Sequence, residues 1–346
     1  LDLSYYPKDR GPYNFNSLAT NNTMPSGSEP NNWGGIMRSI NSTNFEQSNV
    51  EYIQFWILDP YYNEQGVVEN VSNTGKLVFN LGEISEDVLK DGRKSYENGL
   101  PEAGAVTATN SSVWGVTPAS QSLIYAFDTN ENNRTVQDVG LNGLSDQEEA
   151  AKYPTFGALP DPAADNYQFY LNATGGVLDR YKNYNGTQGN SPVNVSDTNR
   201  GSTTFPDVED INRDNTMNTI NAYYKFEIDI TSNPQVGQNY IVDSRLVDNI
   251  PLSDGTQGKS RWIQYKIPIQ ELATNPANAE GPISDLRSVR FMRMFLTGFN
   301  ENITLRFGAL DLVRGEWRRY LGSLDDGSND VTPEENTDDS TGFDVV

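Results

Sequence analysis

The sequence of 346 residues contains no histidine and no cysteine. Without cysteine the chain has no disulfide bond and no thiol nucleophile, and without either residue it lacks the usual ligands of zinc. Catalysis that depends on a histidine base is excluded for the same reason. The absence of two residue types therefore removes several common kinds of site.

Basic residues are scarce, with 25 Lys and Arg against 47 Asp and Glu and a formal net charge of -22. A chain of this charge repels nucleic acid and anionic lipid unless a local basic patch intervenes, and the sequence shows none. No stretch approaches the roughly 18 apolar residues of a membrane-spanning helix, and the N-terminus lacks the pattern of an export signal. We expect no nucleic-acid partner and no membrane span in this segment.

Strand signals dominate the rest of the sequence. Runs rich in β-branched and aromatic residues are bounded by Gly, Pro, Asn or Asp, and they cover residues 50–60, 75–82, 222–230, 260–269, 288–299 and 303–313. In 222–230, apolar Tyr224, Phe226 and Ile228 alternate with charged residues, which indicates an antiparallel sheet with one wet face. Residues 50–60 are apolar on both faces, which predicts a central strand covered on both sides.

Helix signals are short. Ser85 is predicted to cap a helix that ends near Gly92, and Ser145 with Glu148 has the spacing of a capping box that opens a second helix. Neither helix is long enough to organise a core. The fold class predicted is mainly β, an antiparallel β-sandwich of jelly-roll type with short helices and a long Asn/Asp-rich insertion.

We expect four regions along the chain. Residues 1–30 connect from a preceding segment, 31–115 and 221–318 form the two halves of the sandwich, 116–220 form the loop-rich insertion, and 319–346 form an acidic linker. The opening LDLSYY and the closing FDVV resemble strands whose partners are missing from this sequence. These ends favour a piece of a longer polypeptide.

One stretch of the insertion, QDVGLNGLSDQEEA, matches a twelve-position calcium loop that begins at Asp138. Calcium binds oxygen ligands at fixed positions of such a loop, and the expected ligands are Asp138, Asn142, the Leu144 carbonyl, Asp146 and Glu149. Gly140 at the third position supplies no side-chain oxygen. The alternative is a glycine-shaped turn that feeds a capped helix, and the two interpretations are compatible.

A second stretch, DVEDINRDNTMN, places Asp210, Asn212 and Asp214 at alternating positions. The spacing is that of calcium ligands, but Asn221 at the twelfth position cannot supply a bidentate carboxylate. A solvated cluster of Asx turns is the competing interpretation. Structural Ca²⁺ is therefore the one cofactor that the sequence suggests.

Two other functions are open from the residues alone. Exposed aromatic side chains on a jelly roll can stack on sugars, and five tryptophans are available, so a secreted carbohydrate-binding module is an alternative. Paired carboxylates could hydrolyse a glycoside, but nothing singles out two among the 47 acids. We expect no enzymatic activity.

Several long strings carry a resemblance to a known family: YYPKDRGPYNFN at 5–16, WGGIMRSINSTNFEQSNVEYIQFWILDP at 33–60, KLVFNLGEISEDVLKDGRKSYENGLP at 76–101, PDVEDINRDNT at 206–216 and FGALDLVRGEWRRY at 307–320. Together they resemble the SprA/Sov family, the giant outer-membrane translocon of the type IX secretion system in Bacteroidetes. The resemblance covers nearly the whole chain.

The resemblance implies a soluble domain inserted between strands of a very large β-barrel through which folded proteins are exported. Its partners would be the remainder of the translocon barrel, accessory secretion subunits and secreted cargo proteins. Its location would be the outer membrane and the cell surface, and the domain would face the outside because long insertions in such barrels do so. The resemblance supplies no catalytic motif.

Overall fold

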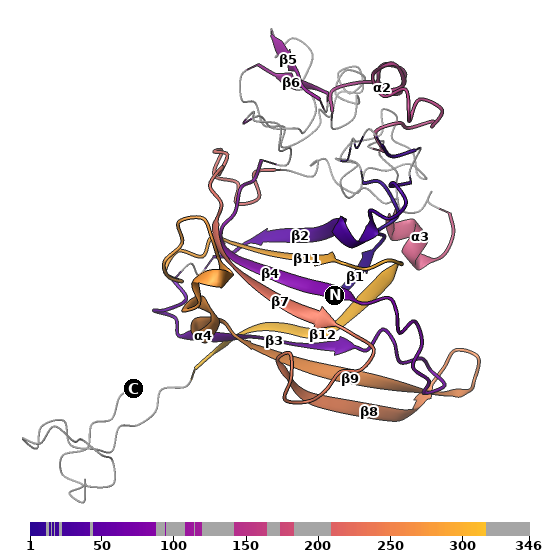
Figure 1. Ribbon diagram of the computed structural model, residues 1–346, viewed down its shortest axis with the longest axis vertical. Coiled ribbons are helices and arrows are strands. Elements are labelled where there is room, and N and C mark those ends of the chain that lie inside the picture. Colours follow the sequence, from indigo (N-terminus) through magenta and orange to yellow (C-terminus); the bar gives the residue numbers. More distant parts are fainter. Residues whose placement is uncertain are drawn as a thin grey trace, which may run out of the picture.

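Two five-stranded antiparallel sheets form the centre of the protein (Figure 1). The computed structural model describes residues 1–11, 14, 16, 18–20, 23–41, 44–87, 94, 108–113, 115–119, 142–164, 174–182 and 209–315. The first sheet has the order β1 (Asp2–Tyr5), β12 (Ile303–Arg314), β3 (Val50–Leu58), β9 (Gln257–Pro268) and β8 (Ile241–Pro251). The second has the order β10 (Ala279–Glu280), β7 (Ala222–Ile230), β4 (Gly75–Glu83), β11 (Phe291–Thr297) and β2 (Trp33–Ser39).

The chain passes repeatedly from one sheet to the other. It runs from β2 to β3 to β4 and later from β9 to β11 to β12, and each step changes sheet. Such crossings build a double-sheet, jelly-roll-like sandwich, in which the inner faces of both sheets bury a shared core. The predicted fold class is therefore confirmed.

The core lies between the two sheets and is rich in aromatic rings. The Phe55 ring of β3 stacks on Tyr265 of β9 at 5.1 Å between centroids and approaches Phe79 of β4 at 5.5 Å. Side chains from both sheets belong to one continuous buried cluster. Strand periodicity places them there because alternate side chains point to the same face.

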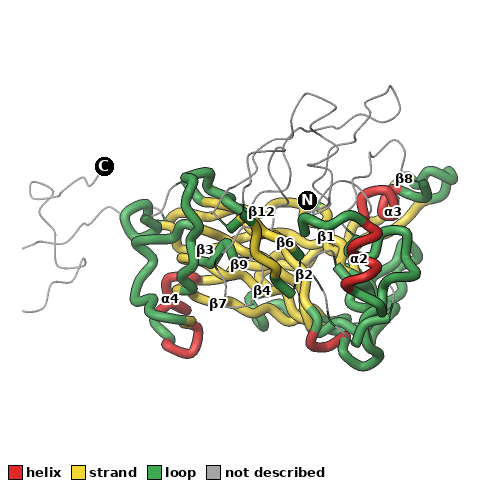
Figure 2. The backbone as a smooth tube through the Cα atoms, turned by 90° about the horizontal axis from the view of Figure 1, so that it is seen from above, coloured by secondary structure: helices red, strands yellow, loops and turns green. Residues whose placement is uncertain are grey.

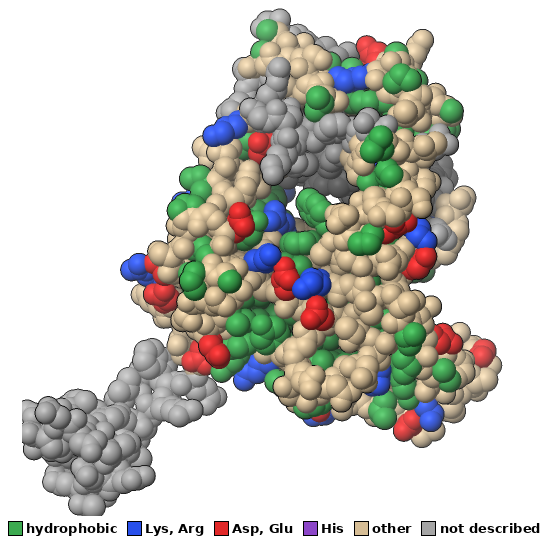
Figure 3. Space-filling model, viewed as in Figure 1, with side chains coloured by type: hydrophobic (Ala, Val, Ile, Leu, Met, Phe, Trp, Pro, Cys, Tyr) green, Lys and Arg blue, Asp and Glu red, His purple; other side chains and the backbone are tan. Residues whose placement is uncertain are grey.

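Strand β7 shows the predicted alternation most clearly. Its inner side chains Tyr224, Phe226 and Ile228 are buried, whereas Glu227 on the outer face accepts Lys76 of β4 at 2.7 Å and Lys225 at 2.9 Å. On the face shown in Figure 3, acidic and basic side chains are interspersed in the same way.

The sequence predicted that the strand at residues 50–60, β3, is covered on both faces, but the strand most buried on both faces is β4. The inner residues of β3 are buried, but its outer residues are only half-buried and lie beneath side chains of their own sheet, such as Arg245 over Trp56 at 5.5 Å and Lys266 over Tyr52 at 4.0 Å. In β4, by contrast, six consecutive residues from Leu77 are buried.

The short elements lie outside the two sheets, with α4 toward one end of the view in Figure 2 and α2 and α3 toward the other. They are the hairpin of β5 (Thr109–Ser111) and β6 (Val116–Pro118), the helices α2 (Asp146–Lys152), α3 (Val177–Lys182) and α4 (Ile269–Ala273), and the 3-10 turns Glu29–Asn31 and Pro276–Asn278. The hairpin and α2 lie together beyond the edge of the second sheet (Figure 1). We call the described residues of 108–119 and 142–164 the α2 lobe.

Two expectations about local structure, one for the opening strand and one for a helix after Ser85, have different outcomes. The opening strand β1 pairs with β12 of the same chain, Asp2 opposite Arg306, so the expectation that its partner is missing was wrong. Ser85 accepts a hydrogen bond from the Asp87 backbone at 3.2 Å, but residues 84–87 are not helical and 88–93 lie outside the described residues. Among the described residues, no helix has the length and apolar character to cross a membrane.

Candidate metal centre

The capping box predicted at the start of α2 is present. The Glu148 carboxylate accepts hydrogen bonds from the Ser145 backbone N–H at 2.9 Å and from the Ser145 hydroxyl at 2.8 Å. These bonds hold the pKa of Glu148 below its usual range. They also fix where the helix begins, and this start places Asp146 and Glu149, three positions apart, on the same side of its first turn.

Asp146 and Glu149 meet a third carboxylate, Asp161, from the loop that follows α2. One oxygen of each side chain lies within 4.8 Å of the other two. Asp146 is exposed, Asp161 is half-buried and Glu149 is fully buried. Elsewhere in the described chain, no other group of three acidic side chains has this spacing.

Glu149 is the centre of this acidic cluster. Its Oε2 accepts the Ala163 backbone N–H at 3.0 Å, whereas its buried Oε1 accepts no hydrogen bond of normal geometry from a described residue. Burial, and after it the charges of Asp161 and Asp146, raise the pKa of Glu149 to about 7, against the lowering effect of Ala163 and of the adjacent Asn142 side chain. No described Lys or Arg forms an ion pair with it.

Asn142 sets the approach of the chain to α2. Its fully buried side chain accepts the Leu144 backbone N–H at 2.9 Å, which forms an Asx turn. Its backbone carbonyl accepts the Val116 N–H of β6 at 2.7 Å. A Cβ atom at Gly115 would lie only 2.0 Å from that carbonyl oxygen, so the hairpin can approach this closely only because the position is glycine.

The loop after α2 is held from the other side by the N-terminal segment. The Arg10 guanidinium lies over the Phe156 ring, 4.1 Å from its centroid, and donates to the Pro162 carbonyl. Arg10 itself is buried. Lys152, at the end of α2, donates to the Ser112 carbonyl at 2.7 Å. Arg10 therefore ties the loop after α2 to the N-terminal segment, and Lys152 ties the end of α2 to the hairpin.

The structure brings together part of the first predicted calcium loop. Asp146 and Glu149 lie close together, the Asn142 side chain is adjacent to Glu149, and Leu144 lies in the Asx turn that Asn142 closes; calcium at these residues stays a prediction. Asp138 lies outside the described residues. The third carboxylate, Asp161, is outside the twelve-position pattern, and spacing carried no signal for it because its position depends on how the loop folds back over α2.

The second predicted loop is closed by its own hydrogen bonds. The two carboxylate oxygens of Asp210 accept the N–H groups of Asp214 and Asn215 at 3.1 and 2.8 Å. The Asp214 carboxylate accepts Thr216 and the Asn212 amide. These are the bonds of the Asx-turn interpretation, and calcium at Asp210, Asn212 and Asp214 stays a prediction.

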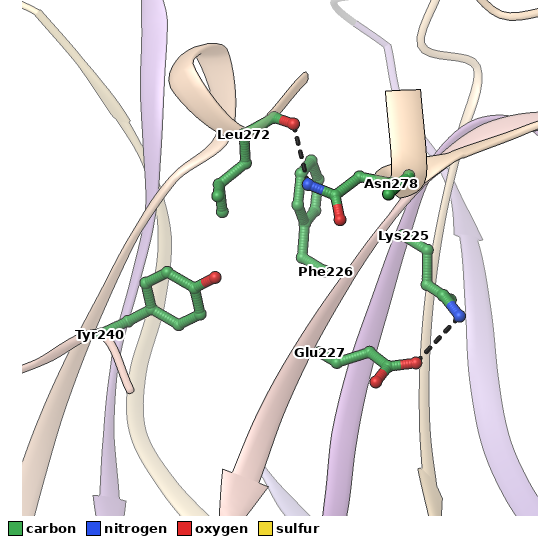
Figure 4. A pocket seen from close by; sticks show the side chains of 7 residues that line it. Lys225, Phe226, Glu227, Tyr240, Leu272 and Asn278 are labelled. Atoms are coloured by element: carbon green, nitrogen blue, oxygen red, sulfur yellow. Dashed lines mark hydrogen bonds and ion pairs between the residues drawn. The ribbon is translucent and has the colours of Figure 1, made fainter. Parts of the chain in front are cut away.

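A hollow between β7, Tyr240 and the segment from α4 to β10 is another candidate for a binding site (Figure 4). It has a volume of about 240 Å³ and is lined by Lys225, Phe226, Glu227, Tyr240, Leu272, Ala277 and Asn278. Its polar groups bond to the protein itself: Lys225 contacts Glu227 at 2.9 Å, and the Asn278 amide donates to the Leu272 carbonyl at 2.9 Å. The hollow therefore offers a ligand little polar recognition.

Comparison with protein families gives a match. The family model SprA_N, described as a motility related/secretion protein, matches residues 141–345. This range contains the acidic cluster, the second predicted loop and strands β7 to β12. No curated protein matches the chain.

The raised pKa of Glu149 predicts how stability depends on pH. Its pKa is about 7 in the folded chain against an ordinary value of 4.5, so the folded state binds the proton more tightly and the free energy of unfolding falls as pH rises through this window. We expect the free energy of unfolding of the wild type to fall by about 1–3 kcal/mol more than that of Glu149→Gln between pH 5 and 8. Urea denaturation in a chelating buffer measures it.

Glu148→Gln is the matched control. The pKa of Glu148 is lowered, so its contribution is lost only as pH falls below the ordinary glutamate range and stays constant between pH 5 and 8. A difference between wild type and Glu149→Gln that is flat across this window would contradict the assignment.

Proposed function

Because the chain belongs to the SprA_N family of motility-related and secretion proteins, we propose that it is a soluble, non-catalytic domain of an outer-membrane protein-export channel of the type IX kind. In this proposal it acts as a cap or scaffold over the channel and as a contact surface for other proteins. The observation that carries the proposal is the family match, which spans well over half of the chain. Its partners are then the remainder of the channel, accessory secretion subunits and exported cargo.

The bonding at one end of the sandwich supports a scaffold role. The buried Tyr61 hydroxyl, just after β3, donates to the carbonyls of Asn73 at 2.7 Å and Ile230 at 3.0 Å. Asn73 in turn accepts the backbone N–H groups of Asn300 and Glu301. A scaffold has to hold its surfaces in a fixed relation, and buried hydrogen bonds between loops of both sheets serve that need.

The chemistry of the acidic cluster supports a role other than glycoside hydrolysis. The oxygens of its carboxylates lie within 4.8 Å of one another, not far below the spacing of about 5 Å used by retaining glycosidases. Glu149, however, is fully buried and has no path to a sugar ring. Its surroundings suit a structural group better than a catalytic one.

The location proposed is the outer membrane, with the domain facing the outside of the cell. The family match supports an association with the cell envelope. The orientation rests on the general tendency of outer-membrane channels to carry their long insertions on the outer side.

Cross-linking in cells tests the proposed role directly. A photoreactive amino acid placed at Leu246 in β8, 61% exposed, and in a second strain at Ile36 in β2, 46% exposed, samples one edge strand of each sheet. We expect at least one position to give adducts with cargo or with secretion subunits in cells that export normally. Export at the normal rate with no such adduct from either position would count against a contact surface.

The carbohydrate-binding alternative makes a different prediction. Trp33 is the most exposed tryptophan of the described residues, at 64%, and contacts Phe295 edge-on at 5.8 Å. If the alternative holds, glycans bind the chain, and Trp33→Ala weakens or abolishes that binding because it removes the exposed ring. We expect flat glycan titrations for both the wild type and the variant, measured by calorimetry.

A further inference from the structure

The acidic cluster has the spacing of ligands that share a single ion. Two oxygens on opposite sides of one Ca²⁺ ion, each bound at 2.3–2.6 Å, lie about 5 Å apart. The oxygens of Asp146, Glu149 and Asp161 all lie within 4.8 Å of one another. One ion can therefore contact all three carboxylates from a position between them.

Burial of one unsatisfied oxygen points independently to a ligand. Glu149 is fully buried, and its Oε1 accepts no hydrogen bond of normal geometry from a described residue. Buried carboxylate oxygens nearly always have a hydrogen-bond partner. Burying one without a partner costs free energy, because its hydrogen bonds to water are lost and not replaced. A cation between Glu149 and the two neighbouring acids supplies the missing partner.

We propose that Asp146, Glu149 and Asp161 bind one Ca²⁺ ion. Ca²⁺ prefers carboxylate, amide and water oxygens and takes six to eight of them, so water and nearby backbone oxygens complete the set. Mg²⁺ fits less well, because it demands near-ideal octahedral geometry, keeps several waters and is usually bound through only one or two carboxylates. The site shares two acids with the twelve-position loop and adds Asp161 to them.

The ion would connect segments that otherwise meet through hydrogen bonds. Asp146 and Glu149 belong to α2, whereas Asp161 precedes Ala163, which donates to Glu149 at 3.0 Å, and Pro162, which accepts Arg10. A bound ion therefore fastens the 159–164 loop to α2 and stabilises its contact with the N-terminal segment. This stabilisation follows mass action and does not rest on the role of the chain in export.

The apolar core of this region is small, so a bound ion would add stability that apolar burial does not supply. The buried residues between the N-terminal segment and the α2 lobe are Ala19, Met24 and Phe156. A cluster of this size buries far less apolar surface than the core between the sheets. Fixing the loop through a cation compensates for that small core.

Calorimetric titration of the full, chelator-treated chain with CaCl₂ tests the proposal. We expect one site, with a Kd between about 10⁻⁶ and 10⁻³ M, and a melting temperature that rises with Ca²⁺ concentration. Asp161→Asn and Asp146→Asn should each weaken binding at least about tenfold, since each removes a charged ligand. Asp146 is exposed, so its variant keeps the test valid even if a change at Glu149 disturbs folding.

Asp254→Asn is the matched control, because Asp254 lies in the turn between β8 and β9, outside both predicted loops, and its carboxylate accepts hydrogen bonds from Thr256. The binding constant of this variant should equal that of the wild type. Asp214→Asn reports separately on the second predicted loop, where its carboxylate is hydrogen-bonded to Thr216 and Asn212. The proposal is overturned if the wild type shows no heat and no thermal shift up to about 10 mM Ca²⁺, well above the weakest Kd of extracellular calcium modules. It is also overturned if Asp161→Asn binds as tightly as the wild type, if Asp214→Asn alone loses binding, or if Mg²⁺ stabilises as much as Ca²⁺.

Discussion

The packing of two sheets against one aromatic core is the constraint on which the rest of the structure depends. The ring of Phe55 lies 5.1 Å from Tyr265, 5.5 Å from Phe79 and 5.8 Å from Phe307, so four strands from both sheets meet at one point. Apolar burial of this extent dominates the free energy of folding. The α2 lobe lies outside this core, which is why its position depends on polar contacts such as those of Arg10.

The central strands could be predicted from the sequence, but the edge strands β2 and β8 could not. Strands such as β7 and β9 have one fully apolar face and therefore show a period of two. The edge strand β2 begins with Trp-Gly-Gly and buries none of its side chains fully, and β8 exposes Val242, Leu246 and Val247. An edge strand gains its order from backbone pairing, which leaves little pattern in the side chains.

The candidate site was predictable only where it is local in sequence. The capping box at Ser145 and the gathering of Asp146 with Glu149 follow from helical geometry. Asp161 joins them because the loop after α2 folds back and Arg10, more than 130 positions earlier than α2, holds that loop in place. At Asp210 the limit is different, because Asx turns and calcium ligands use the same alternating spacing, and the sequence alone does not separate the two interpretations.

Fractionation of cells that produce the protein tests the central claim, membership in an envelope export channel, most directly. An antibody raised against this chain, used on separated membrane and secreted fractions, reports both size and location. The account predicts a band several times larger than 38.5 kDa that is confined to the outer membrane. A soluble band near 38.5 kDa in the secreted fraction would contradict it and would favour the carbohydrate-binding alternative.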